Sequence, residues 1–227
     1  GPYCKARQRL PLALIRRLAL MVGETLEQES PSDWKWRGRS VKLMDGTTIS
    51  MPDTASNQAA YPQSGAQQAG LGFPLAMLVA VISLSTGAVL EWALGPCRGK
   101  HTGEQALFRE LMPRLESGDI VLADRYHCNY FTAALLVERG VDLVTRQHQR
   151  RITDFRRGRR LGRRDHLVDW IRPKRPGWMD IETYESIPVR VSMRETEIGG
   201  RILVILIRNR NGINNPVPCG DAFDAGW

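Results

Sequence analysis

The stretch "DIVLADRYHCNY", residues 119–130, decides the fold because it joins the pattern of a buried strand to a carboxylate. Four apolar residues, 120–123, are followed at once by Asp124, and short apolar runs of this kind are typical of strands inside parallel sheets. An ionised carboxylate at the end of such a strand is costly unless a cation, a metal or a hydrogen-bond donor receives it. The pattern therefore predicts a buried strand with a functional group at its carboxyl end.

Strand and helix patterns alternate on both sides of this stretch. Helical spacing predicts helices at 101–112, with Thr102 as the N-cap, and at 129–139. Extended patterns predict strands at 41–44, 74–84, 88–94 and 141–145, with a second extended stretch at 49–51 as a candidate continuation of the first strand. The Gln-, Ala- and Gly-rich residues 53–72 indicate a surface loop. With right-handed crossovers, this order predicts an α/β fold with a mixed sheet flanked by helices.

The two ends of the chain differ in texture from this central part. We expect an amphipathic helix at 8–28, followed by Trp34 and Trp36 packed against the core. Beyond the centre the pattern becomes strand-like, with Gly199 and Gly200 as a hairpin turn. The sequence thus divides into an N-terminal helical segment (1–40), a central α/β core (41–149), a β-rich basic insertion (150–207) and an irregular tail (208–227).

Composition limits the class of protein. The 227 residues are 42% hydrophobic and 25% charged, which is typical of a globular chain. The four cysteines form no C-x-x-C pair, so neither a disulfide framework nor a zinc finger is expected, and a reducing, cytoplasmic location is favoured. No apolar run reaches the roughly 18–20 residues that span a bilayer, so no membrane association is expected.

Positive charge is concentrated in one segment. The net charge is +8, and residues 146–164 hold nine arginines and one acid, Asp154. Arginine pairs bidentately with phosphate, so the segment predicts binding to nucleic acid, although a solvated basic loop is the alternative. The predicted DNA-binding residues here are Arg150, Arg151, Arg156, Arg157, Arg159, Arg160, Arg163 and Arg164.

Two aspartates are candidate metal ligands. Asp45 ends the predicted strand 41–44 and Asp124 ends the strand 120–123, and neighbouring strands can bring both to one edge of a sheet. Two facing carboxylates repel unless a divalent cation lies between them, and Mg²⁺ (or Mn²⁺) suits such a pair. In the two-metal scheme one ion activates the attacking oxygen and the other stabilises the leaving oxygen of a phosphodiester. The alternative is that each aspartate only caps a turn.

Two other chemistries are less well supported. "LGPCRGKHTGE", residues 94–104, is similar to a phosphate-binding loop of a nucleotide triphosphatase, but Gly95 and Gly99 enclose three residues instead of four, and His101 takes the place of the hydroxyl residue. His127 and Cys128 are adjacent, and no third group that would orient them is visible in the sequence. A thiol nucleophile is therefore not favoured.

Four segments together resemble bacterial insertion-sequence transposases of the DDE class, the IS-four family. They are "VKLMDGTTISMPDTASNQAAYPQ", "GLGFPLAMLVAVISLSTGAVLEWALGPCRGKHTGEQALFREL", "GDIVLADRYHCNYFTAALLVERGVDLVTR" and "DHLVDWIRPKRP". The resemblance covers roughly residues 3–208. It implies a ribonuclease-H-like core, a β insertion, and Mg²⁺-dependent cleavage and joining of DNA ends in transposition. Asp45 matches the first catalytic aspartate and Asp124 the second, while Arg125 and Tyr126 belong to the second motif and are expected to contact DNA or brace the site.

The sequence departs from the family at its C-terminal end. The family's third carboxylate is a glutamate on a helix with a Tyr…Arg…Glu…Lys signature, and no such helix is predicted after Ile207. Glu195 and Glu197 lie in the predicted hairpin and are poor substitutes. We therefore expect a truncated transposase that is catalytically incomplete and shows little or no strand transfer. The alternative is a non-catalytic DNA-binding remnant, and in either case the chain is expected on the nucleoid, with a homodimer on DNA as one possibility.

Overall fold

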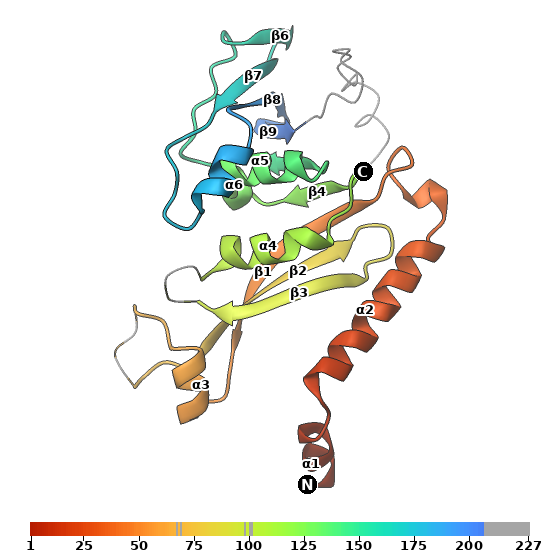
Figure 1. The fold of residues 1–227 in the computed structure, drawn as a ribbon, viewed down its shortest axis with the longest axis vertical. Helices are drawn as coiled ribbons and strands as arrows, with labels where there is room; N and C mark the ends of the chain where they lie inside the picture. The colour runs from red at the N-terminus through yellow and green to blue at the C-terminus, as the bar shows by residue number, and fades with distance from the viewer. Residues whose placement is uncertain (67, 69, 98, 100–101, 207–227) are drawn as a thin grey trace.

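The computed structural model describes residues 1–66, 68, 70–97, 99 and 102–206, and Figure 1 shows an α/β arrangement of one large sheet with helices against it. Its helices are α1 (Pro2–Gln8), α2 (Leu12–Glu29), α3 (Ala55–Ala60), α4 (Glu104–Leu111), α5 (Tyr130–Glu138) and α6 (Ile181–Ser186), with 3₁₀ turns η1 (Ser32–Trp34), η2 (Met112–Arg114) and η3 (Arg125–His127). Its strands are β1 (Val41–Ser50), β2 (Leu75–Ser83), β3 (Val89–Pro96), β4 (Ile120–Ala123), β5 (Asp142–Arg146), β6 (Arg159–Gly162), β7 (Asp165–Ile171), β8 (Arg190–Ile198) and β9 (Arg201–Leu206).

The nine strands form one mixed sheet in the order β3-β2-β1-β4-β5-β9-β8-β7-β6. The central strands β1, β4 and β5 are parallel, and all other neighbours are antiparallel. The predicted α/β class, with a mixed sheet flanked by helices in the manner of ribonuclease H, is confirmed. Because β9 pairs with β5, the strands of the basic insertion continue the sheet of the core. The predicted hairpin turn is also confirmed, since Gly199 and Gly200 both have positive φ, which β-branched or bulky residues adopt at a cost.

Helices α4 and α5 cover one face of the sheet and form the core with it (Figure 1). On α4 the apolar residues recur at helical spacing, and Leu107, Phe108 and Leu111 are buried. The predicted N-cap is wrong by one residue. Gly103 occupies that position with φ 92°, and the Thr102 hydroxyl instead donates to the carbonyl of Gly99 at 2.9 Å. The helix therefore begins just after a residue whose backbone conformation favours glycine.

Strand β1 is longer than predicted. The sequence places a strand end at Asp45, but β1 continues to Ser50 and Asp45 lies near its middle. The reason is the hairpin partner β2, which pairs with β1 without a break and sets Asp45 opposite Ala80. A turn-forming Asp-Gly pair is thus held extended by the continuous pairing of β1 with β2 from Lys42 to Ser50, which overrides its local preference.

The N-terminal segment is also more broken and more exposed than predicted. The helix predicted at 8–28 begins only at Leu12, after Pro11, because proline has no N–H to donate inside a helix, and residues 2–8 form the additional short helix α1. Helix α2 packs on β3 where Gly23 lies against the carbonyl of Val89, an approach that a Cβ would block. The expectation for the two tryptophans is wrong, since Trp34 is 57% and Trp36 41% exposed.

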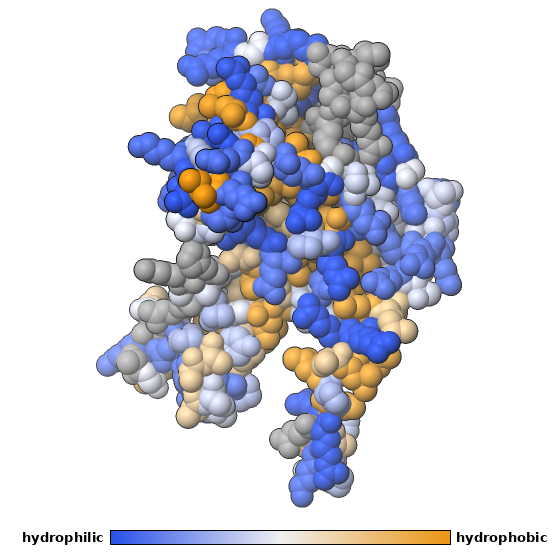
Figure 2. Space-filling model, viewed as in Figure 1, coloured by the Kyte–Doolittle hydropathy of each residue, from blue (hydrophilic) through white to orange (hydrophobic). Residues whose placement is uncertain are grey.

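Apolar side chains of α2 remain at the surface, where Figure 2 shows a hydrophobic patch. In the described part of the chain no helix is both long and apolar enough to cross a membrane.

Candidate metal centre and nucleic-acid interface

The two predicted aspartates follow a parallel strand pair. Met44 on β1 is the partner of Ala123 on β4, so Asp45 and Asp124 each come one residue later at adjacent positions. The Asp124 carboxylate accepts a hydrogen bond from the Tyr126 N–H at 2.7 Å and so caps η3. The Asp45 carboxylate accepts one from the neighbouring N–H of Gly46 at 2.9 Å. Both side chains are exposed, so each can reach a ligand from solvent.

A third carboxylate lies beside this edge. Glu104 is the first residue of α4, and its carboxylate is hydrogen-bonded to His127, with 2.8 Å between Glu104 Oε1 and His127 Nε2. Ligand atoms of Glu104, Asp124 and His127 all lie within 4.8 Å of one another. Asp45 is not a member of this three-residue group. However, its neighbour Gly46 contacts Glu104, since a Cβ built on Gly46 would lie 2.8 Å from Glu104 Cγ.

Sequence reasoning missed Glu104 as a site residue. It treated "GKHTGE" as a possible phosphate loop and found no partner for His127. The signal was present, because Glu104 begins a helix that follows a strand, but the contact with His127 spans 23 residues and depends on how α4 crosses the sheet. Lys100 and His101 of the phosphate-loop alternative lie outside the described residues.

His127 is fully buried at the centre of this arrangement. Its ring makes edge contacts with Phe108 and Tyr126 at centroid distances of 5.2 and 5.7 Å. Its Nδ1 has no hydrogen-bond partner among the described residues. The adjacent Cys128 is 5% exposed, and burial raises the pKa of its thiol to about 11. The thiolate fraction near neutral pH is therefore very small, which argues against a cysteine nucleophile.

Next to Asp124, the two other residues of the second motif lie at the surface. Arg125 and Tyr126 form η3, and Tyr126 is 48% exposed. Tyr126 also borders a cavity of about 520 Å³, in which the guanidinium carbon of Arg109 stacks 3.8 Å from the ring centroid of Trp178. Burial lowers the pKa of Arg109, although the nearby Tyr126 acts in the opposite direction. The side chains beside the aspartates are thus aromatic and cationic.

Most arginines of the basic segment 146–164 reach into solvent. The side chains of Arg156 and Arg157 are 90% and 80% exposed although both pair with Asp154. The side-chain and backbone hydrogen bonds from Arg156 lower the pKa of Asp154 to about 2. Arg164 pairs with Glu197 and is 56% exposed. The other exposed members of the predicted set are Arg150, Arg159, Arg160 and Arg163.

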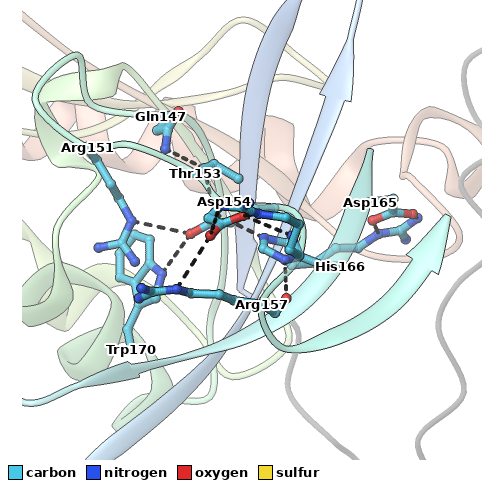
Figure 3. A network of polar contacts seen from close by, with 11 residues as sticks. Gln147, Arg151, Thr153, Asp154, Arg157, Asp165, His166 and Trp170 are labelled. Carbon is cyan, nitrogen blue, oxygen red and sulfur yellow. Dashed lines mark hydrogen bonds and ion pairs between the residues drawn. The ribbon is translucent and has the colours of Figure 1, made fainter. Parts of the chain in front are cut away.

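One arginine of the set makes contacts within the protein. The guanidinium of Arg151 lies 3.7 Å over the ring of Trp170 and donates to Glu195 Oε1 at 3.3 Å (Figure 3). Its contacts are thus within the protein, and it fixes the basic segment to the sheet. The Arg151 side chain is still 38% exposed, and direct DNA binding by it stays a prediction.

Several side chains of this region meet at the carboxylate of Glu195, which acts as a hydrogen-bond acceptor. It is 2% exposed, and its carboxylate accepts from Trp170 Nε1 at 2.9 Å, from the Thr153 hydroxyl at 2.6 Å and from Arg151, with His166 Nε2 at 3.2 Å. Burial acts to raise the pKa of Glu195, but these hydrogen bonds and the Arg151 charge lower it below its usual range. We call these five residues the Glu195 cluster. A carboxylate with both oxygens used in this way is a poor metal ligand, as the sequence predicts.

Comparison with known proteins agrees with this geometry. Residues 36–213 match the family described as "Transposase DDE domain". Over 171 residues the chain is 26% identical to a protein of Escherichia coli (strain K12), "Transposase InsG for insertion sequence element IS4". The match covers 72% of this chain and 36% of that relative, so the chain spans about a third of the relative's length.

Proposed function

Because the chain belongs to the transposase DDE domain family, as its resemblance to the IS-four transposases predicts, we propose that it is a catalytic core that cleaves DNA with a divalent metal ion. The observation that supports the proposal is the register of β1 and β4, which pairs Met44 with Ala123, the residues that precede Asp45 and Asp124. In open sheets that contain parallel strands, ligands bind at the carboxyl ends of those strands. The proposed site lies at the carboxyl end of β4, beside the part of β1 that contains Asp45.

The residues at this edge suit a hard cation. Mg²⁺ and Mn²⁺ prefer oxygen ligands, and Mg²⁺ takes one or two protein carboxylates together with water and phosphate oxygens. Within the described residues, neither Asp45 nor Asp124 forms an ion pair with lysine or arginine, so their charge is not neutralised by the protein. When bound, the metal supplies activation of the attacking oxygen and stabilises the leaving oxygen of a phosphodiester.

We propose that the basic segment and η3 bind the DNA. Exposed arginines of residues 150–164 neutralise phosphates, and binding through such contacts weakens steeply with salt. Arg125 and Tyr126 lie directly after Asp124 and would meet the DNA nearest to the metal. A homodimer on DNA and a cytoplasmic, nucleoid-associated location remain predictions from the sequence.

The test of this proposal is a nicking assay with the complete 227-residue chain. Purified protein and supercoiled plasmid are incubated with Mn²⁺ or Mg²⁺, and open-circular DNA is measured on a gel. We expect nicking that is lost in Asp45→Asn and Asp124→Asn and retained in Asp33→Asn, an exposed carboxylate outside the proposed site. Nicking that survives in both site variants would refute the proposed metal ligands.

The same assay separates the two candidate functions. Salt-sensitive DNA binding with no metal-dependent nicking would favour the non-catalytic DNA-binding remnant. Little or no joining of DNA ends is predicted for the 227-residue chain, because its sequence predicts no helix with the family's Tyr…Arg…Glu…Lys signature. Joined products that disappear in Asp124→Ala would contradict that prediction. Absence of DNA binding would remove both functions.

A further inference from the structure

We propose that Glu104 is a third carboxylate of the metal site, placed by helix α4 and oriented by His127. The inference rests on the proposed function for Asp124 and goes beyond it. Glu104 belongs to neither aspartate motif and was treated in the sequence only as part of a possible phosphate loop. The cation it would bind is a hard divalent ion of the Mg²⁺ or Mn²⁺ class.

The first observation is the distance between charged groups. Glu104 and Asp124 offer ligand atoms within 4.8 Å of each other, with His127 as the third member of the group. In the described residues neither carboxylate forms an ion pair with lysine or arginine, although the chain carries a net charge of +8. Two ionised carboxylates this close repel each other, and a shared cation removes the repulsion. A cation shared by Glu104 and Asp124 would relieve this repulsion.

The second observation is the buried histidine behind Glu104. His127 has 0% exposure, and its Nε2 lies 2.8 Å from Glu104 Oε1. Ligating carboxylates are commonly held by such hydrogen bonds, which fix the orientation of the ligand. With Oε1 engaged by the histidine, Oε2 of Glu104 stays available for a cation. The Glu104 side chain is 21% exposed, so it is reached from solvent while its carboxylate is held from the protein side.

The third observation is the close approach of Glu104 to β1. A Cβ on Gly46 would lie 2.8 Å from Cγ and 2.9 Å from Cδ of Glu104, so the carboxyl group lies directly against the strand residue that follows Asp45. Glycine at this position lets α4 bring its first residue to the strand edge. Asp45, Asp124 and Glu104 thus come from three elements, β1, the end of β4 and the start of α4.

The test measures metal binding and not only cleavage. Mn²⁺ is titrated into the complete chain, and the free ion is followed by its electron paramagnetic resonance signal. The variant is Glu104→Gln, whose amide oxygen still accepts from His127 Nε2, and the matched control is Glu110→Gln, an exposed glutamate on the same helix. We expect the dissociation constant to rise about ten-fold or more in Glu104→Gln and to stay unchanged in the control. Circular dichroism melting shows that both variants are folded.

Asp124→Asn and Asp45→Asn distinguish the possible failures. If these two variants lose Mn²⁺ binding and Glu104→Gln does not, the role of Glu104 is refuted while the proposed function stands. If none of the three weakens binding, both the metal site and the third ligand are wrong. If Glu104→Gln and Asp124→Asn weaken binding and Glu110→Gln does not, the inference is supported.

The positioning role of His127 has its own comparison. His127→Gln keeps an N–H donor that can reach Glu104, whereas His127→Leu keeps bulk without a donor. We expect Leu to raise the Mn²⁺ dissociation constant and Gln to restore most of the affinity. Equal losses in two folded variants would show that the hydrogen bond does not position Glu104.

Discussion

Replacement of Glu195 by alanine should destabilise the protein far more than replacement of an exposed residue of the same β-hairpin. The Glu195 side chain is 3% exposed and accepts hydrogen bonds from Trp170, Thr153 and Arg151, while His166 lies within 3.2 Å. Alanine would leave these polar groups buried without their acceptor. A buried polar group left without its partner costs about 1–3 kcal/mol, and because Trp170 and His166 are both buried we expect a total loss of about 3–5 kcal/mol.

The assay is unfolding followed by circular dichroism, by heat and by urea. For a chain of this size, about 3–5 kcal/mol corresponds to a fall in Tm of about 6–20 °C. The matched control is Glu197→Ala, two residues along the same strand, where the carboxylate pairs with the exposed Arg164. Such surface pairs contribute about 0–1 kcal/mol, so the control should melt within a few degrees of the parent chain.

The DNA affinity provides a second readout of the same substitution. Because Arg151 and Thr153 anchor the basic segment to Glu195, loss of the carboxylate should loosen that segment and weaken DNA binding, although no DNA-contacting residue is removed. A Tm for Glu195→Ala equal to that of Glu197→Ala would refute the reasoning. It would mean that the Glu195 cluster contributes no more than a surface ion pair.

Three other predictions concern charge and packing. Arg150→Ala should lower the slope of log K against log salt for DNA binding by about 0.9, measured by fluorescence anisotropy, and an unchanged slope would exclude a phosphate contact. The pKa of Glu195 in the folded state lies below its usual value of 4.5. The ionised carboxylate therefore stabilises the fold above that pH, and this stabilisation is lost as pH falls through the folded-state pKa. We expect the urea midpoint of the parent to fall more steeply below pH 4.5 than that of Glu195→Ala. Parallel curves would contradict this. Gly46→Ala should displace Glu104 and weaken Mn²⁺ binding with a stability cost of about 1–3 kcal/mol, and unchanged binding in a folded variant would show that the approach of Glu104 to β1 is not needed.

Local patterns in the sequence were sufficient for several parts of this protein. The run of apolar residues before Asp124 predicts β4, and the structure ends the strand at Ala123. The pair Gly199-Gly200 predicts the turn between β8 and β9, and helical spacing predicts α5 within one residue at each end. These features depend on neighbours a few residues apart, so the sequence carries them directly.

Contacts between segments far apart in the sequence could not be predicted from such local patterns. The sequence ends β1 at Asp45, but pairing with β2 carries the strand to Ser50. It gives His127 no partner, yet the crossing of α4 over the sheet brings Glu104 to it. It dismisses Glu195 as a ligand without revealing that four side chains converge on it.

The sequence by itself therefore determined the α/β class, because short-range periodicity specifies it, and it supplied the two aspartates and the arginines as predicted site residues. Only the tertiary structure decided that the basic insertion extends the core sheet through β9 on β5, that Arg151 contacts Trp170, and that Glu104 lies near Asp124. The physical reason is that side chains from separate elements meet only after strand order, register and helix crossing are fixed. Those are set by the burial of the whole core, and no short window of sequence contains them.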